Sequence, residues 1–185
     1  MHKVTYSMGV SLDGYIYGPD GTFDWSVPDD EVYANYVDEL RRLDVHLMGR
    51  RLYEVMAYWD TATDLEGVEA EWARLWLELP KVVLSSTLTQ VHGSNVSLAR
   101  GTLAEEVARW KARPGDGEIA IGGAGLAVGA AELDLIDEYR AMVHPVIVGG
   151  GTPFVPQLER RFDLELVESR TFASKVVLLR YAVVR

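Results

Sequence analysis

The sequence predicts an α/β fold in which helices flank a mostly parallel central sheet that ends in an antiparallel C-terminal hairpin. Strand-like and helix-like segments alternate along most of the 185 residues, and this alternation is typical of parallel strands joined by helices. The strand-like segments are short runs of Val, Ile, Leu and Tyr bounded by Gly, Ser, Thr or Pro. Two such segments follow one another near the C-terminus without a helix between them, which predicts the hairpin.

Seven segments have the composition and the boundaries of strands. The last two are joined near residues 172–174 and are expected to close one edge of the sheet. The glycines of "VGGGTPF" (Val148–Phe154) indicate a tight passage of the chain before Pro153. In chain order, the expected strands are Val4–Val10, Val45–Met48, Lys81–Ser85, Glu118–Ile121, Glu138–Val148, Leu164–Thr171 and Lys175–Val184.

The first expected helix, Asp29–Leu43, has favourable charges at both of its ends. It begins after Pro28 with acidic residues in its first turn. It ends in Arg41 and Arg42, and this distribution suits the helix dipole, which is positive at the N-terminus and negative at the C-terminus.

Four further helices follow along the chain. Thr102 can cap the third of them, with Glu105 as the acid of a capping box. The second has an apolar stripe at helical spacing, Val68, Trp72, Leu75, Trp76 and Leu79, which is expected to pack on the sheet or to line a pocket entrance. These four helices are Arg51–Tyr58, Glu66–Leu79, Leu103–Lys111 and Leu126–Leu133.

Composition restricts the class of protein. A length of 185 residues indicates a single domain over 1–185, and 48% hydrophobic residues suffice for a sizeable core. The net charge of -10 argues against nucleic-acid and anionic-membrane partners. The chain has no cysteine and its four histidines lack metal-ligand spacing, so no disulfide or metal site is expected. Without a signal peptide or a long apolar run, a cytoplasmic protein is expected.

The densest group of glycines lies between an expected strand and an expected helix, in "EIAIGGAGLAVG". Gly122 and Gly123 would let the backbone approach a diphosphate, and the start of the helix would offer free N–H groups. Gly125 and Gly129 would allow the helix to approach a ligand or the sheet. The spacing matches neither the Rossmann fingerprint nor a P-loop, so a tight turn without a ligand is the alternative.

Two other strands also end in residues suited to phosphate. In "LMGRRLYEVM", Arg50 and Arg51 begin a helix after Gly49, where the helix dipole disfavours cations unless an anion is bound. The alternative is that these arginines are solvated or pair with acidic residues. In "VVLSSTL", the hydroxyls of Ser85 and Ser86 can contact phosphate or ribose, or they only form a turn.

The position of these motifs in the fold carries more information than any one of them. If the three strands are parallel, their carboxyl ends lie at one edge of the sheet, where open α/β sheets bind ligands. Gly-Arg-Arg, Ser-Ser and Gly-Gly-x-Gly would then form one adenine dinucleotide site with a cationic grip for an additional phosphate.

The chain resembles the dihydrofolate reductase superfamily, and within it the branch that includes the reductase domain of bacterial riboflavin biosynthesis. The matching segments are "SMGVSLDGYIYG", "LMGRRLYEVM", "VVLSS", "IAIGGAGL" and "VIVGGGTPF", in the family's order and over nearly the whole length. The resemblance implies a three-layer dihydrofolate reductase-like fold, NADPH as cofactor and a homodimer.

Residue by residue, the resemblance assigns most of a cofactor site. Gly49, Arg50 and Arg51 match the turn and helix that hold the adenosine phosphates, and Ser85 and Ser86 match the strand end near the 2'-phosphate. The diphosphate loop corresponds to Gly122, Gly123, Ala124, Gly125 and Leu126, and the nicotinamide neighbours to Met8, Gly9, Ile16 and Tyr17.

The substrate side follows from "DWSVPDD", which resembles a Trp-x-x-Pro-x-Asp pattern of the folate enzymes. It makes Asp30 the candidate acid or ring-binding residue, with Trp25 and Tyr53 as pocket walls. The alternative is that Asp29 and Asp30 only start a helix. Asp13 would bond substrate hydroxyls, or only form the turn with Gly14.

The resemblance therefore predicts an NADPH-dependent reductase that transfers hydride to a pyrimidine- or pterin-like small molecule, most like 5-amino-6-(5-phosphoribosylamino)uracil reductase. Two alternatives stay open: dihydrofolate reductase activity, or a dinucleotide-binding module without turnover. Tyr15 stands where the riboflavin enzymes usually have a basic residue, and this departure favours the module.

Overall fold

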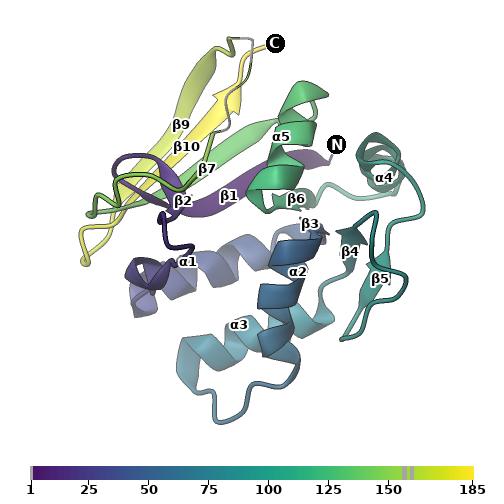
Figure 1. Cartoon of the computed structure of the whole chain (residues 1–185), viewed down its shortest axis with the longest axis horizontal. Coiled ribbons are helices and arrows are strands. Elements are labelled where there is room, and N and C mark those ends of the chain that lie inside the picture. The colour runs from purple at the N-terminus through teal and green to yellow at the C-terminus, as the bar shows by residue number, and fades with distance from the viewer. Residues whose placement is uncertain (1, 156–157, 159–160) are drawn as a thin grey trace.

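The computed structural model describes residues 2–155, 158 and 161–185, and its main feature is an eight-stranded sheet (Figure 1). The strand order is β5-β4-β3-β6-β1-β7-β10-β9. The six strands from β5 to β7 pair in parallel, and β10 is antiparallel to both of its neighbours. The strands are β1 (Lys3–Ser11), β3 (Leu43–Gly49), β4 (Lys81–Leu84), β5 (Val96–Leu98), β6 (Glu118–Gly122), β7 (Glu138–His144), β9 (Leu164–Thr171) and β10 (Val177–Val183).

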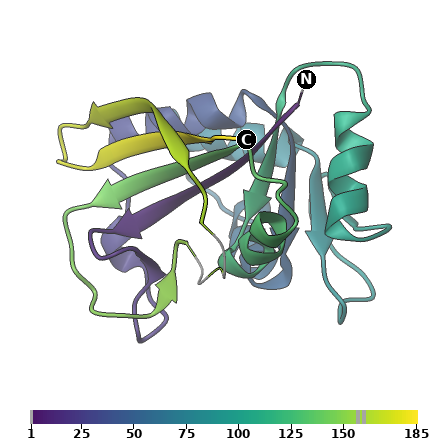
Figure 2. The ribbon, with the colours of Figure 1, turned by 90° about the horizontal axis from the view of Figure 1, so that it is seen from above.

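Helices cover both faces of this sheet and make three layers. Figure 1 shows α1 and α3 on one face and α5 on the other, and Figure 2 shows the yellow C-terminal hairpin at one end of the sheet and α4 at the opposite end. The predicted α/β class, with a mostly parallel sheet and an antiparallel C-terminal hairpin, is confirmed. The helices are α1 (Asp30–Leu40), α2 (Arg50–Met56), α3 (Gly67–Glu78), α4 (Leu103–Lys111) and α5 (Ala124–Glu132).

Side chains alternate along each strand and so divide the core in two. In β3, Val45 and Leu47 belong to the cluster that also contains Val107 of α4 and Ala130 of α5. Met48, which points the other way, packs with residues of α1 and α3. In that second cluster the rings of Trp72 and Trp76 are stacked with their centroids 5.3 Å apart. The apolar stripe of α3 thus packs on the sheet, which is one of the two predicted arrangements.

Several segment boundaries differ from the predictions. Helix α1 ends at Leu40, and Leu43 already begins β3, so Arg41 and Arg42 follow the helix rather than form its last turn. Strand β7 ends at His144, because Pro145 cannot donate a ladder hydrogen bond. Helix α5 begins at Ala124, two residues earlier than expected. The predicted capping box of Thr102 is present, and Asp29, expected as the first residue of its helix, instead caps α1 by accepting from the Val32 amide.

Three short strands and two single turns of 3-10 helix are additional to the predicted elements. Strand β2 (Tyr15–Tyr17) pairs with β8 (Thr152–Pro153) in a two-stranded sheet, and β5 lies at an edge of the main sheet. Segments of two or three residues are too short to show a periodic pattern. The turns are η1 (Asp24–Ser26) and η2 (Ala57–Asp60). No helix in the described residues has the length and apolarity that a membrane span requires.

Candidate active site

The three strand ends singled out in the sequence lie next to one another. Strands β4, β3 and β6 are neighbours and run in parallel. Gly49 is in register with Leu84, the last residue of β4, and Met48 is in register with Gly122. The Gly-Arg-Arg, Ser-Ser and Gly-Gly-x-Gly segments therefore leave the sheet at the same edge, and their predicted convergence is confirmed.

The two arginines at this edge differ in whether their guanidinium groups already have partners. Arg50 donates to Glu54 through Nε (2.6 Å) and to Thr87 through Nη1 (3.1 Å), so pairing with an acidic residue holds for this arginine. Arg51 is exposed and forms no hydrogen bond or ion pair within the part of the chain that the structure describes. It lies near Tyr17: burial raises the pKa of Tyr17, and the Arg51 charge acts in the opposite direction. One guanidinium at this edge is thus open to an anion.

Some serines and glycines of this edge hold the backbone in place, and others are exposed and available to a ligand. Ser85 Oγ accepts hydrogen bonds from the amides of Thr87 and Leu88, so it forms the turn, whereas Ser86 is exposed. Gly123 has a positive φ of 89°, a conformation in which a side chain would be strained. At Gly125 a Cβ would meet nothing within 4 Å, so the backbone faces open space.

Ala124, Leu126 and Ile16 lie toward the core. Ile16 is buried in the cluster that α4 and α5 share with the sheet. Ala124 and Leu126 pack against the same cluster. Any contact of these three residues with a cofactor would therefore come mainly from their backbone.

An inner cavity of about 540 Å³ opens beneath α1. It exists because the side chains that β1 and β6 turn toward this helix are small: Thr5, Ser7, Gly9 and Ala120 line it. Its lining includes Met8 and Gly9, two of the predicted nicotinamide neighbours. Seven aromatic residues line the cavity: Phe23, Tyr33, Tyr36, Tyr58, Trp59, Trp72 and Trp76. Such a space suits a flat ring.

Several polar side chains line the inner cavity. Glu39 is only 8% exposed and accepts a 2.9 Å hydrogen bond from Ser7. Burial raises the pKa of Glu39, although the charge of Arg140 opposes this effect. The imidazole of His46 stays neutral because burial lowers its pKa to about 4, and its Nδ1 has no hydrogen-bond partner. The cavity therefore combines aromatic walls with a few polar contacts.

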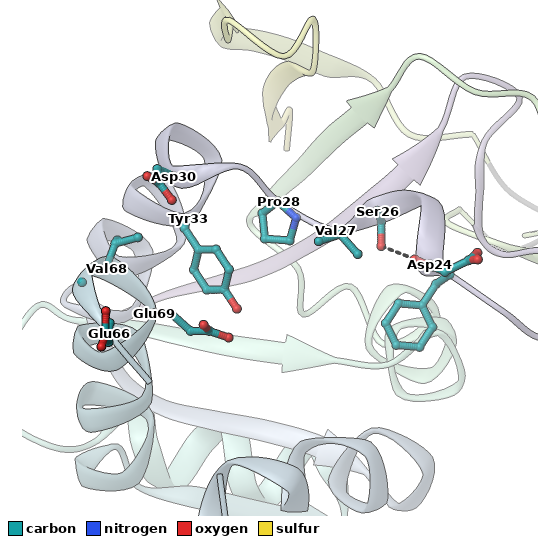
Figure 3. Close-up of a pocket in the computed structure, with 11 residues that line it drawn as sticks. Asp24, Ser26, Val27, Pro28, Asp30, Tyr33, Glu66, Val68 and Glu69 are labelled. Atoms are coloured by element: carbon teal, nitrogen blue, oxygen red, sulfur yellow. Dashed lines mark hydrogen bonds between the residues drawn. The ribbon is translucent and has the colours of Figure 1, made fainter. Parts of the chain in front are cut away.

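An outer pocket of about 760 Å³ adjoins the cavity, and Phe23, Pro28 and Tyr33 line both (Figure 3). In Figure 3 the Tyr33 ring projects into this pocket, with its hydroxyl on the side of Glu69. Burial raises the pKa of Tyr33 to about 12, and the neighbouring Glu69 carboxylate adds to the effect. The described residues that line the outer pocket include four acidic ones, Asp24, Asp30, Glu66 and Glu69, and no lysine or arginine.

The predicted acid, Asp30, lies in the outer pocket and not in the inner cavity. It is exposed at the first position of α1, directly after the capping residue Asp29. The carboxylate that the structure brings into the inner cavity is Glu39, nine residues further along α1. Helical spacing offered a signal for it, because Tyr33, Tyr36 and Glu39 recur every three residues on one side of the helix.

The other three predicted substrate residues do not line either cavity. Asp13 accepts hydrogen bonds from the amides of Val148 and Gly149, and bonds from Ser11 and these amides lower its pKa. The Tyr53 hydroxyl exchanges hydrogen bonds with the backbone of His92. The Trp25 ring packs edge-on against His144 with centroids 5.6 Å apart. Their predicted substrate contacts stay predictions.

Comparisons with known proteins agree with this architecture. Residues 2–178 match the RibD C-terminal domain family. The chain is 31% identical over 179 residues to the uncharacterized protein YyaP of Bacillus subtilis. The aligned region covers 97% of this chain and 94% of YyaP. Among solved structures, a protein of Shewanella sp. PV-4 assigned to riboflavin biosynthesis has a TM-score of 0.80 and 28% identity over the full length of both chains.

A more distant structure shares the fold alone. It is the diaminohydroxyphosphoribosylaminopyrimidine deaminase/5-amino-6-(5-phosphoribosylamino)uracil reductase of Thermotoga maritima, with a TM-score of 0.70 and 15% identity. The match covers 99% of this chain and 57% of the Thermotoga chain. The resemblance inferred from the sequence motifs is therefore confirmed at the level of the family and of the fold.

Proposed function

The chain belongs to the RibD C-terminal domain family, and from this premise we propose that it is an NADPH-dependent reductase. Its substrate would be a pyrimidine- or pterin-like ring that receives a hydride. The observation that carries the proposal is the meeting of three phosphate-suited strand ends beside an aromatic cavity. Leu52 connects the two regions, because it lines the cavity and packs on Gly122 of the glycine loop.

The residues at the sheet edge fit a dinucleotide phosphate. Arg51 and Ser86 are exposed and unpaired within the described chain, and they would hold the 2'-phosphate beside Arg50 and Ser85. Gly49 and Gly125 have open space where a side chain would stand, so phosphate oxygens could approach the backbone there. The diphosphate would lie along the loop from Gly122 to Leu126.

The nicotinamide end would enter the inner cavity next to Met8 and Gly9, whereas Ile16 and Tyr17, the other two predicted neighbours, do not line this cavity. When bound, the cofactor supplies the hydride, and the share of this chain is to orient the two rings and to exclude water. Gly9 lines the cavity without a side chain, so the nicotinamide ring would lie beside β1 at this position. The aromatic walls from α1 and α3 would then hold the substrate ring over it.

The deciding experiment measures oxidation of NADPH in the presence of pyrimidine and pterin substrates, by loss of the absorbance of the reduced nicotinamide. NADH in the same assay reports the preference for the 2'-phosphate. Binding of NADPH, read as a rise in the thermal midpoint, is measured separately. Oxidation with a pyrimidine supports the proposal, and oxidation with dihydrofolate alone supports folate chemistry instead. Binding without oxidation of any substrate favours a binding module.

We also propose a homodimer that forms through β9. This strand lies at the outer edge of the sheet, and all of its residues except Glu168 are exposed. Leu164, Leu166 and Val167 are apolar side chains on this surface, which water would not favour leaving uncovered. A second copy of the chain would bury them.

A further inference from the structure

The charges along the path into the active site restrict the chemical class of the substrate. The inner cavity and the outer pocket form one passage, because Phe23, Pro28 and Tyr33 line both. A molecule bound in the inner cavity can therefore extend into the outer pocket. The groups on this passage decide which substituents the molecule can carry.

The inner end of the passage offers an acceptor with spare capacity. The Glu39 carboxylate receives the 2.9 Å bond from Ser7 and a long contact of 3.5 Å from Asn35. A carboxylate has about four acceptor positions, so Glu39 can accept further N–H groups. Glu39 is 8% exposed and lines the cavity, so these positions are directed at a bound molecule rather than at bulk water. An N–H edge of a heterocycle supplies such donors.

The single cation in the described lining of the cavity is already neutralised. Arg140 donates to Glu138 at 2.6 Å and to Glu118 at 2.8 Å, and it is 1% exposed. Both carboxylates hold the guanidinium within the sheet, and Glu39 adds a third negative charge nearby. The inner cavity therefore has no free positive charge for a phosphate.

The outer pocket is the less favourable place for an anion. Glu69 is half-buried and its carboxylate points into the pocket beside Tyr33 (Figure 3). Asp30 and Glu66 lie on the same rim, and no lysine or arginine is among the described residues that line it. A phosphate on the outer part of the substrate would meet like charges without compensation, and an ammonium group would meet opposite ones.

We propose that the substrate is a flat, phosphate-free heterocycle whose N–H edge binds Glu39 and whose outer end is neutral or positively charged. This inference rests on the proposed function for the position of the cofactor, and it concerns the same cavity. It separates this chain from a reductase that acts on a phosphoribosyl compound. The aromatic walls bind the ring, Glu39 fixes its orientation, and the acidic rim selects its outer substituent.

The test is a matched series of compounds with one aminopyrimidinone ring and an outer arm that ends in a hydroxyl, an ammonium or a phosphate. Dissociation constants are measured by calorimetry with NADPH present. We expect the phosphate compound to bind at least about tenfold more weakly than the ammonium compound, because like charges face each other across the rim. The difference should shrink at high salt. Equal or tighter binding of the phosphate compound, or no binding of any compound, overturns the proposal.

Two variants test which residues cause the preference for ammonium over phosphate. Glu69→Gln should reduce the ratio of ammonium to phosphate affinity by a factor of about 3 or more, since one carboxylate of the rim is lost. Glu39→Gln should weaken all three compounds by a similar factor and leave the ratio unchanged. Glu132→Gln, an exposed acid at the end of α5 on the other face of the sheet, should change neither quantity. A ratio that Glu69→Gln leaves intact contradicts the proposal.

The binding test of the substrate class does not depend on whether the protein oxidises NADPH. If the charge preference is found but no compound supports oxidation of NADPH, the reductase proposal fails and the substrate class stands. If NADPH is oxidised and the phosphate compound is preferred, the reductase proposal stands and the substrate class fails.

Discussion

The backbone of Gly122 lies directly against the imidazole of His46. A Cβ at Gly122 would overlap Cε1 of His46 and Cδ2 of Leu52. His46 is itself held by an edge-on contact with Trp76, with ring centroids 5.3 Å apart. The carboxyl end of β6 therefore packs against His46 and Leu52, two residues that also line the inner cavity.

This contact predicts different effects for two alanine substitutions. Gly122→Ala should destabilise the protein by about 1–3 kcal/mol, because the added methyl group forces His46 and Leu52 to shift. Gly125→Ala should leave stability unchanged or raise it by about 0.5–1 kcal/mol, because the site is open and helical. Denaturant unfolding measures both values. A Gly122→Ala variant as stable as the wild type would show that the contact is not tight.

The second of these variants also tests the proposed diphosphate loop. Gly125→Ala should weaken NADPH binding although the fold is intact, since the methyl group would occupy the space assigned to a phosphate. Calorimetry with NADPH provides the measurement. An unchanged dissociation constant would place the diphosphate elsewhere.

The meeting of the three strand ends could be predicted from the sequence because the signals for it are local. Gly49, Arg50 and Ser85 directly follow short apolar strands, and parallel pairing is sufficient to bring such ends together. The boundaries of helices and strands were harder to predict from the sequence. Leu43 fits an amphipathic helix as well as a strand, and only the pairing of β3 with β6, which comes 75 residues later in the chain, decides between them.

The inner cavity could not be predicted, because it results from missing side-chain volume on strands that are distant in sequence. Thr5 and Ala120, which both line the cavity, become neighbours only through the pairing of β1 with β6. In the sequence Glu39 is one of several acids on a charged helix, and its burial and its bond to Ser7 arise only when α1 packs against the sheet. The sequence motif instead favoured Asp30, which lies at the rim.

Arg51 provides a prediction on cofactor choice. Arg51→Ala should raise the dissociation constant of NADPH about tenfold or more, since a hydrogen bond to a charged group contributes about 1.5–3 kcal/mol. The constant for NADH should hardly change, because NADH lacks the 2'-phosphate. Arg74→Ala, which removes an exposed ion pair with Glu78 on α3, is the control for a lost surface charge. Equal losses for both cofactors would contradict a role in 2'-phosphate recognition.

Another prediction concerns the buried ion cluster around Glu138. This carboxylate is fully buried and pairs with Lys3, Arg140 and Arg180. Burial opposes its ionisation, but hydrogen bonds from Arg180, Lys3 and Arg140 lower its pKa from the ordinary 4.5 to about 2. Glu138→Gln should cost about 3–5 kcal/mol of stability at neutral pH, because it removes the buried carboxylate that Lys3, Arg140 and Arg180 share and leaves only part of their charge compensated.

The lowered pKa also predicts the acid limb of the stability curve. Because the folded-state pKa lies below the unfolded one, the contribution of Glu138 is complete above pH 4.5 and is lost as the pH falls toward 2. Unfolding in denaturant at a series of pH values should show this decline, and Glu138→Gln should reduce its slope. Glu132→Gln is the control and should follow the wild-type curve. An identical slope for Glu138→Gln would exclude Glu138 as a source of the decline.

The proposed dimer surface on β9 is tested by two leucines of equal exposure. Leu166 on β9 is 52% exposed and Leu133, at the end of α5, is 53% exposed. If β9 of two copies meet, Leu166→Glu places two like charges near the symmetry axis and should give a monomer in sedimentation at a concentration where the wild type is dimeric. Leu133→Glu should stay dimeric, because it changes hydrophobicity by the same amount away from that edge. A monomeric wild type, or a dimeric Leu166→Glu variant, would exclude β9 as the interface.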